Sequence, residues 1–340
     1  MNAAKALNLL LAATVVILAL LYVSAAKQPA HPPGTAPATT PHPGAEEEYV
    51  LIAVSVGNAY WIDARDGFND AARDLGVRAT FTGPQGSDVR QQVDLIDTSI
   101  GRGVRGIILV PAEPEAVIPA IDRAIAAGIP VITQDTDSPR SRRYTFIGTG
   151  NFQAGRQGGD LLARQIGGRG EVAILTIPGQ WNLEERRRGY EAALAQYPGI
   201  KIVAVGNDQA EESQAAAEAK SILQAHPDLA GMGCVDAAGG VGAAVAVRDV
   251  GKQGVIKIIA MDRNEATLDF IEQGFIQASL AQRSYSMAYL GLQMLHDLNH
   301  GKIKMIADWR AAGTCPLPAL VDTGAVIITP ANVRHFRHAK

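Results

Sequence analysis

The chain has little net charge, little cysteine and few aromatic residues, and each shortage excludes a class of protein. Its formal net charge is −3, so it shows no sign of the basic face that a nucleic-acid-binding protein needs. The two cysteines, Cys234 and Cys315, have a spacing that fits no metal motif. They could pair across space, but a chain of 340 residues needs no disulfide to hold its core, so we expect two free thiols. We predict no metal and no cofactor.

Aromatic residues number only 7 phenylalanines, 3 tryptophans and 8 tyrosines. Two of them nevertheless stand side by side, as Tyr60 and Trp61, in the segment SVGNAYW (55–61). This segment follows an apolar run that predicts the first strand. An aromatic pair at that point either packs the start of the next helix or presents a flat face to a ligand. We expect at least one of the two rings to face a ligand.

The amino terminus holds a long apolar stretch, residues 6–26, which Lys5 and Lys27 flank. Its length reaches the roughly 20 residues that span a bilayer. The stretch also fits a signal peptide, with Lys5 as the positive region and Val23-Ser24-Ala25 (23–25) as the cleavage site. Residues 1–27 are therefore predicted to be a signal peptide or a membrane anchor. In either case the rest of the chain is exported, to the periplasm or the extracellular face.

Residues 28–48 are rich in proline and end in three consecutive glutamates. This composition cannot bury a core and predicts a semi-extended linker. A long linker is useful when the segment upstream is held at a distance. The linker therefore favours an uncleaved anchor, with residues 6–26 in contact with the inner membrane.

From Tyr49 onward, short β-branched runs alternate with segments of helical periodicity. After a strand at 49–56, Phe68, Ala71 and Leu75 recur at helical spacing, and Gly76 ends that helix. The next helix is expected to begin from a cap at Ser87. Further strands are expected at 77–82, 106–110, 130–134, 171–177, 200–205, 231–235 and 255–261. Continuous apolar strands alternating with helices indicate parallel sheets that are covered on both faces.

The strands are too numerous for one compact sheet, so the predicted fold is α/β with two doubly wound parallel-sheet lobes. The helical pattern pauses around FIGTGN (146–151), where we place a crossing between the lobes.

Polar residues gather where strands end, which is where ligands of such sheets bind. They include Asn58, Asp135, Thr136, Asp236, Asp262 and Gln282. One aspartate after a strand is commonly a turn residue, but the repetition at five strand ends indicates a site. Carboxylates, amides and an arginine such as Arg186 pair well with the hydroxyls of a sugar, and an aromatic ring covers its apolar face.

Two enzyme classes, dehydrogenases and hydrolases, can be compared with the sequence. Gly240-Val241-Gly242 (240–242) opens a helix and Asp262 follows 20 residues later, as in a dinucleotide fingerprint. However, the third glycine position is Val245, and four residues separate the motif from its strand. A hydrolase would need a placed base, and none of the seven histidines follows a strand. We therefore expect no enzyme.

From about Tyr49 to Val333 the chain resembles the periplasmic sugar-binding proteins of the ribose-binding type, which serve ABC transporters. The resemblance is carried in order by SVGNAYW with GFNDAARDLG, RGIILVPAEPEAV, AAGIPVITQDTD, FIGTGNFQAGRQGGDLL, EERRRGYEAAL, CVDAAGGVGAA, IIAMDRNEATLDFIEQGFIQASLAQ and VDTGAVIITPANV. It implies a ligand held between two lobes that are joined by three crossings. The first lobe would comprise 49–149 and 283–319, and the second 150–282 and 320–338.

The resemblance also implies roles for single residues. It assigns ligand binding to the asparagine and two aromatics after the first strand, the aspartate after the fourth strand, the second-lobe arginine, the last aspartate and the hinge glutamine. In this sequence these are Asn58, Tyr60, Trp61, Asp135, Arg186, Asp262 and Gln282. Crossings are expected near 148–150, 282–283 and 320–323.

Three departures from the pattern bear on the ligand. Thr136 replaces the arginine that is usual in the ribose-binding members, which puts ribose itself in doubt. The second-lobe aromatic expected near Gln209 is missing, and Trp181 in the neighbouring loop is its substitute. Asp236 stands after a valine, where an Asn-Asp pair is usual. We therefore expect a monosaccharide or a related polyol, delivered to an ABC transporter permease. The alternative is a tethered sugar sensor for a chemoreceptor or sensor kinase.

Overall fold

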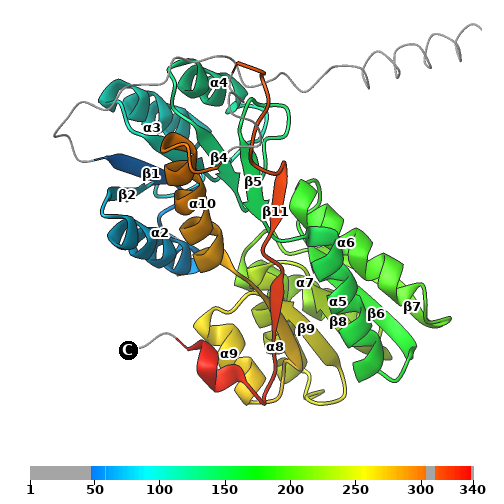
Figure 1. Ribbon diagram of the computed structural model, residues 1–340. Coiled ribbons are helices and arrows are strands. Elements are labelled where there is room, and N and C mark those ends of the chain that lie inside the picture. The colour runs from blue at the N-terminus through cyan, green and yellow to red at the C-terminus, as the bar shows by residue number, and fades with distance from the viewer. Residues whose placement is uncertain (1–46, 58, 304–310, 338–340) are drawn as a thin grey trace, which may run out of the picture.

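The computed structural model describes residues 47–57, 59–303 and 311–337. They form two α/β lobes, one above the other in Figure 1, and the chain passes repeatedly between them. Each lobe is built on a six-stranded sheet. The predicted fold class is confirmed.

The first lobe has an entirely parallel sheet in the order β11-β5-β4-β3-β1-β2. Its strands are β1 (Glu48–Ile52), β2 (Arg78–Thr82), β3 (Gly106–Leu109), β4 (Val131–Gln134), β5 (Thr145–Gly148) and β11 (Leu320–Asp322). Its helices are η1 (Ala59–Trp61), α2 (Ile62–Leu75), α3 (Val89–Arg102), α4 (Ile118–Ala126) and α10 (Ser284–Asn299).

Both faces of this sheet are buried because successive strand residues point to opposite sides. On β1, Tyr49 and Leu51 pack in one core with residues of α2 and α10. Val50 and Ile52 pack in a second core with residues of α3 and α4. The strand is therefore apolar at every position after Glu48, as the continuous runs in the sequence predict.

The second lobe has the sheet order β12-β10-β9-β8-β6-β7, parallel except for β12. Its strands are β6 (Arg169–Thr176), β7 (Gly199–Asn207), β8 (Leu229–Cys234), β9 (Lys257–Met261), β10 (Ala278–Gln282) and β12 (Ala325–Ile328). Its helices are α5 (Asn151–Gln165), α6 (Trp181–Leu194), α7 (Glu212–Ala225), α8 (Ala237–Asp249), α9 (Glu265–Glu272) and η2 (Val333–Phe336). Residues of α5 and α6 pack on one face, and residues of α7, α8 and α9 on the other.

Three crossings join the sheets, between β5 and α5, between β10 and α10, and between β11 and β12. The last one differs from the predicted boundary, which gave residues from 320 onward to the second lobe. Leu320–Asp322 instead form an edge strand of the first sheet, paired with β5. The Asp322 carboxylate then accepts hydrogen bonds from the backbone N–H groups of Gly150 and Gly324, at 2.7 and 2.8 Å. It thereby ties two of the crossings together.

Two local predictions are corrected by side-chain contacts. The cap of α3 is Asp88, not Ser87, because the Asp88 carboxylate accepts from the backbone N–H groups of Arg90 and Gln91. The end of the predicted linker is also ordered, since Glu48 begins β1. Glu48 is buried because Arg78, Arg102 and Thr80 supply partners for its charge.

The two cysteines are free, as predicted, with Cys234 in the second lobe and Cys315 in the segment before β11. Within the part of the chain that the structure describes, no helix is both long enough and apolar enough to cross a bilayer. The apolar stretch 6–26 and the linker up to residue 46 lie outside the described residues.

Candidate binding site between the lobes

The carboxyl ends of strands from both sheets bring most of the predicted residues together. Asp135 follows β4 in the first lobe, and Asp262 follows β9 in the second. Arg186 acts electrostatically on both carboxyls, and Asp262 acts on Tyr60 of the first lobe. These groups therefore form one polar cluster at the junction of the lobes.

Arg186 is the centre of this cluster, and it is only 3% exposed. Its Nε donates to Asn151 Oδ1 at 2.8 Å, and its Nη1 donates to the Val235 carbonyl at 2.9 Å. Its Nη2 donates to Gln282 Oε1 at 2.7 Å. All three nitrogens of the guanidinium are thus held in a fixed orientation toward the junction.

Close packing of α5 against α6 sets the position of this arginine. A Cβ at Gly155 of α5 would lie 1.9 Å from the Arg186 carbonyl oxygen, and one at Gly189 of α6 would lie 2.2 Å from that of Phe152. Because glycine lacks Cβ, the two backbones approach closely enough to bury Arg186 between them.

Gln282 links the arginine to the hinge and to an acidic residue. Its Oε1 also accepts from the Thr149 hydroxyl at 2.9 Å, and its Nε2 donates to Asp262 Oδ1 at 3.2 Å. Thr149 lies in the first crossing, and Gln282 ends the strand before the second. A side chain at the hinge is therefore bonded to the cluster that a ligand would contact.

The two adjacent aromatic residues, Tyr60 and Trp61, have different roles. Trp61 is 5% exposed and packs in the core with residues of β1, α2 and α10. Tyr60 meets its ring edge-on, with 4.8 Å between centroids, and donates its hydroxyl to Asp135. Tyr60 therefore joins the polar cluster, whereas Trp61 supports it from the core side.

Backbone strain marks the same edges of the two sheets. Among the described residues, positive φ outside glycine occurs at Asp135 (63°), Gln209 (56°), Ala210 (58°) and Asp262 (66°). All four follow strands β4, β7 or β9. Such conformations cost energy and persist where the surrounding structure imposes them, often at functional sites.

The buried acids hold their protons more tightly than free carboxyls do. Burial raises the pKa of Asp262 to about 6, with Arg186 opposing the shift and Asp135 adding to it. Burial also raises the pKa of Asp135, against the effects of the Tyr60 hydroxyl and Arg186. Both carboxyls lack sufficient compensation in the protein alone, so hydroxyl donors from a ligand would stabilise them.

Asp236 belongs to a second acidic pair beside this cluster. It caps α8, since its Oδ1 accepts from the Gly239 N–H at 2.9 Å. Burial, together with the charge of Asp208, raises its pKa to about 7. The fold leaves the Oδ2 atoms of both aspartates without a fixed hydrogen-bond donor. Two carboxyls in this arrangement favour sharing one proton.

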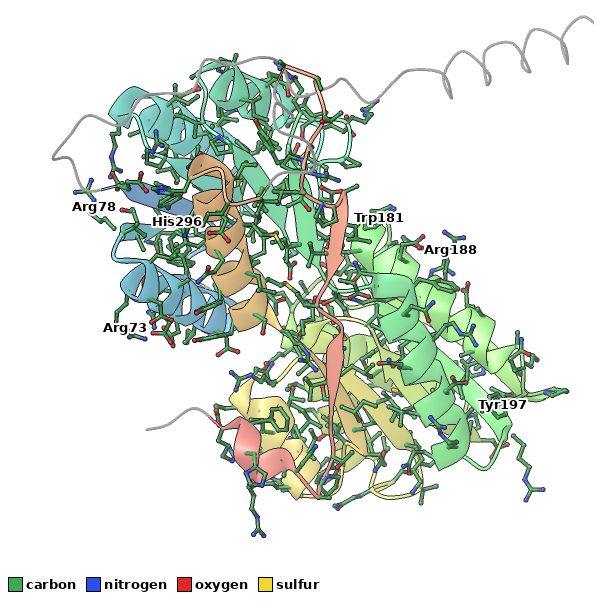
Figure 2. All side chains as sticks on the ribbon, viewed as in Figure 1. Arg73, Arg78, Trp181, Arg188, Tyr197 and His296 are labelled. Atoms are coloured by element: carbon green, nitrogen blue, oxygen red, sulfur yellow. The ribbon has the colours of Figure 1, made fainter. Side chains whose placement is uncertain are left out.

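The remaining predicted residues are Trp181, Thr136 and Asn58. Trp181 begins α6 and is 59% exposed, at the upper end of that helix in Figure 2. Thr136 is partly buried, and its N–H donates to the Gln134 carbonyl at 2.6 Å. Asn58 lies outside the described residues.

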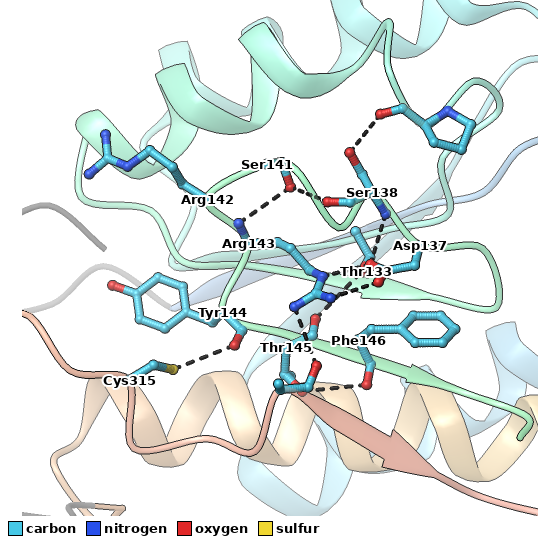
Figure 3. Close-up of polar contacts among 12 residues, drawn as sticks. Thr133, Asp137, Ser138, Ser141, Arg142, Arg143, Tyr144, Thr145, Phe146 and Cys315 are labelled. Atoms are coloured by element: carbon cyan, nitrogen blue, oxygen red, sulfur yellow. Dashed lines mark hydrogen bonds and ion pairs between the residues drawn. The ribbon is translucent and has the colours of Figure 1, made fainter. Parts of the chain in front are cut away.

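The loop that follows Asp135 is held by its own polar network (Figure 3). Asp137 accepts from the Thr133 hydroxyl and the Ser138 N–H, and forms a two-point contact with Arg143 at 2.6 Å. Arg143 also donates to the Ala319 carbonyl just before β11. This network fixes the turn that carries Asp135, so Asp137 serves structure.

Sequence reasoning missed Asn151 and Asp208. Asn151 stands in the FIGTGN segment, which we treated only as a crossing, although it is the residue that orients Arg186. Asp208 directly follows β7, so the rule on strand ends would have found it. The predicted strand stopped at 205, whereas β7 continues to Asn207.

The glycines that resembled a dinucleotide fingerprint serve packing. A Cβ at Gly242 would lie 2.3 Å from the Cβ of Ala215 in α7, and one at Gly240 would lie 2.5 Å from that of Ala260 in β9. Side chains with metal-ligand spacing lie elsewhere, at the amino end of β1.

A two-lobed chain with a buried polar cluster at its hinge matches one family model. Residues 49–303 match the periplasmic binding protein domain. The chain belongs to the periplasmic binding protein family. The Gly240–Gly242 segment and the interlobe cluster both lie within the matched range.

Several relatives of this periplasmic binding protein are known. The D-allose-binding periplasmic protein of Escherichia coli is 26% identical over 263 residues, covering 74% of this chain and 85% of the relative. A sugar-binding protein of a Bacillus halodurans sugar ABC transporter is 34% identical, with a TM-score of 0.82, covering 86% of this chain and all of that one. The arabinose-binding protein AraP of Geobacillus stearothermophilus is 35% identical, with a TM-score of 0.80 and the same coverage.

Proposed function

We propose that this protein captures a monosaccharide or a related polyol between its lobes and delivers it to an ABC importer. The observation that carries the proposal is the Arg186 cluster, in which a guanidinium held by three hydrogen bonds acts on two buried acids with raised pKa values. The relatives support it, since one is named for allose, one for arabinose and one for a sugar ABC transporter.

In this mechanism the sugar binds one lobe first, and its contacts with the other lobe select the closed form. Asp135, Asp262 and Gln282 pair with ring hydroxyls, and Tyr60 or Trp181 covers the apolar face of the ring. Asn58 and Asp236 add further polar contacts. The closed rim is then the surface that the permease recognises.

Specificity follows from burial. Once the lobes close, a ligand that lacks one hydroxyl leaves a buried partner unsatisfied, at a cost of roughly 1–3 kcal/mol. Thr136 has neither the charge nor the reach of an arginine, which supports a ligand other than ribose.

The names of the relatives favour transport over sensing. We also propose that this protein binds its ligand without catalysing a reaction. Membership of a periplasmic family supports export of the chain. We further propose that residues 6–26 keep it at the inner membrane.

The test is a thermal-shift screen of the purified protein against pentoses, hexoses, deoxy sugars and polyols, beside NAD and amino acids. A ligand at a hundredfold excess over its Kd adds about 2.7 kcal/mol of stability, which raises the melting temperature measurably. We expect a shift with one monosaccharide or polyol. A shift with NAD or an amino acid alone would contradict the proposed ligand class.

A further inference from the structure

A separate cluster of side chains lies at the end of the first lobe opposite the interlobe site. It consists of Glu47, just before β1, and of His296 and His300 at the end of α10. Figure 2 shows His296 beside the first strand. One potential ligand atom from each of the three residues lies within 4.8 Å of the other two.

The fold, not the local sequence, creates this group. Glu47 and His300 are 253 residues apart in the chain, yet His300 Nε2 lies 3.0 Å from Glu47 Oε2. The two histidines are four residues apart on one helix, so they share a face, and their ring centroids are 4.1 Å apart. His296 is 8% exposed, and the nearest charged group to its Nδ1 is the Asp297 carboxylate, at 3.5 Å and outside hydrogen-bond geometry.

The surroundings orient the carboxylate of Glu47. The Tyr49 hydroxyl donates to Glu47 Oε2 at 3.3 Å, and Asn299 Nδ2 donates to that hydroxyl at 3.2 Å. In metal sites, hydrogen bonds from residues behind the ligands hold those ligands in the orientation that binds the ion.

The local field combines opposing charges. His300 caps the carboxyl end of α10, where the helix dipole favours a cation, and the Asp297 carboxylate lies 3.5 Å from His296 Nδ1. Arg105 and Lys302 oppose a cation, but Arg105 lies at the other oxygen of Glu47, 3.5 Å from Oε1. Lys302 contacts Asp297 at 3.3 Å. The Oε2 atom that faces His300 accepts from the Tyr49 hydroxyl at 3.3 Å and keeps a second lone pair that a metal could bind.

We propose that Glu47, His296 and His300 bind Zn²⁺ or a similar divalent transition metal. Two imidazoles and one carboxylate are a common zinc ligand set, and the three side chains would rotate toward one another to reach bond lengths of about 2.0–2.2 Å. His300 is exposed, so water can complete the coordination. The metal would fasten the start of β1, and with it the end of the preceding segment, to α10.

The proposal is tested by calorimetric titration of the exported, untagged protein with ZnCl₂. We expect one tight equivalent that H300Q and E47Q weaken by at least about tenfold, since each variant removes one ligand. The His300 side chain is 39% exposed and that of Glu47 is 17% exposed, so we expect both variants to fold. Zinc should also raise the melting temperature of the wild type but not that of H300Q.

The matched control is H226Q. His226 also lies beside a carboxylate, 3.5 Å from Glu171, but among the described residues it belongs to no group of three metal-ligating side chains. H226Q should bind zinc as the wild type does. Equal binding by H300Q, E47Q and the wild type, or no binding by the wild type at micromolar zinc, would overturn the proposal. Sugar binding is measured in parallel, and it is expected to be unaffected by all three variants.

Discussion

At the scale of single residues, Asp262 offers the sharpest test of the interlobe site. Its carboxyl is buried, its φ is positive, and its pKa is raised to about 6. Asp262→Asn keeps a residue that tolerates this backbone conformation but removes the charge. We expect the Kd for the sugar to rise by at least about tenfold, which corresponds to the loss of one buried hydrogen bond to a charged group.

The stability of the ligand-free protein separates this effect from misfolding. Because the variant removes a carboxyl that burial destabilises, its melting temperature without ligand should match or exceed that of the wild type. A variant that retained the full ligand-induced shift would exclude Asp262 from the site.

Trp61, at the end of η1, and Trp181, at the start of α6, allow a matched comparison. Trp61→Ala should lower the free energy of unfolding by about 3–5 kcal/mol, because the ring packs in the core of the first lobe. Trp181→Ala should change it by no more than about 0.5 kcal/mol, because the side chain is exposed. Urea unfolding measures both values.

Binding assays then assign the ligand face. If Trp181 covers the sugar ring, Trp181→Ala weakens every sugar that binds. An unchanged affinity would leave Tyr60 as the aromatic that faces the ligand. The adjacent pair was visible in the sequence, but its division of roles was not, since only the packing of α2 and α10 decides which ring enters the core.

At the scale of secondary-structure elements, the start of α8 makes the free energy of unfolding depend on pH. Asp236 faces Asp208, Cys234 and Arg186, and its folded-state pKa of about 7 lies above the ordinary value of 3.8. The folded state therefore binds more protons than the unfolded state between about pH 4 and 7. Stability from this group is full below that window and is lost as the pH rises through it.

Asp236→Asn should flatten this dependence. Asparagine still caps α8, because its side-chain oxygen can accept from the Gly239 N–H. The slope of unfolding free energy against pH should differ from that of the wild type by up to about 1.4 kcal/mol per pH unit. Urea midpoints between pH 4.5 and 8 measure it, and parallel curves for the two proteins would rule out the shared proton.

The strands also show which site residues could be predicted from the sequence. The predicted strand ends located Asp135, Asp236 and Asp262 because long apolar runs have clear limits. Asp208 was missed because Gly206 and Asn207 resemble a turn, whereas the structure extends β7 through both. Pairing with β6 imposes strand conformation there, and no local signal reports it.

At the scale of the whole molecule, one ion pair bridges the lobes. Arg263, after β9, donates to the Asp63 carboxylate of α2 and to the Phe336 carbonyl of η2. Arg263→Gln should favour the open form and weaken sugar binding by about 1.5–5-fold, the range of a partly exposed ion pair. Small-angle X-ray scattering should show a larger radius of gyration without ligand.

Arg337→Gln is the control for this prediction. Arg337 makes ion pairs with Glu265, Asp269 and Glu272, all within the second lobe. Its loss should leave both scattering and affinity unchanged. If the two variants scattered alike, the Arg263 bridge would have no role in closure.

The two-lobe fold was predictable because strand and helix periodicities alternate along the chain. The edge strand Leu320–Asp322 was not, since it has three residues and Leu320 is exposed. Such a strand exists through its pairing with β5 alone, so the boundary at residue 320 was wrong.

This last pair of strands has a consequence for synthesis. Residues 320–328 supply an edge strand to each sheet, and α10 returns to the first lobe after the second is almost complete. A chain that grows from its amino terminus therefore completes neither core until its final few dozen residues emerge. Nearly the whole polypeptide is therefore made before either lobe can form its complete sheet.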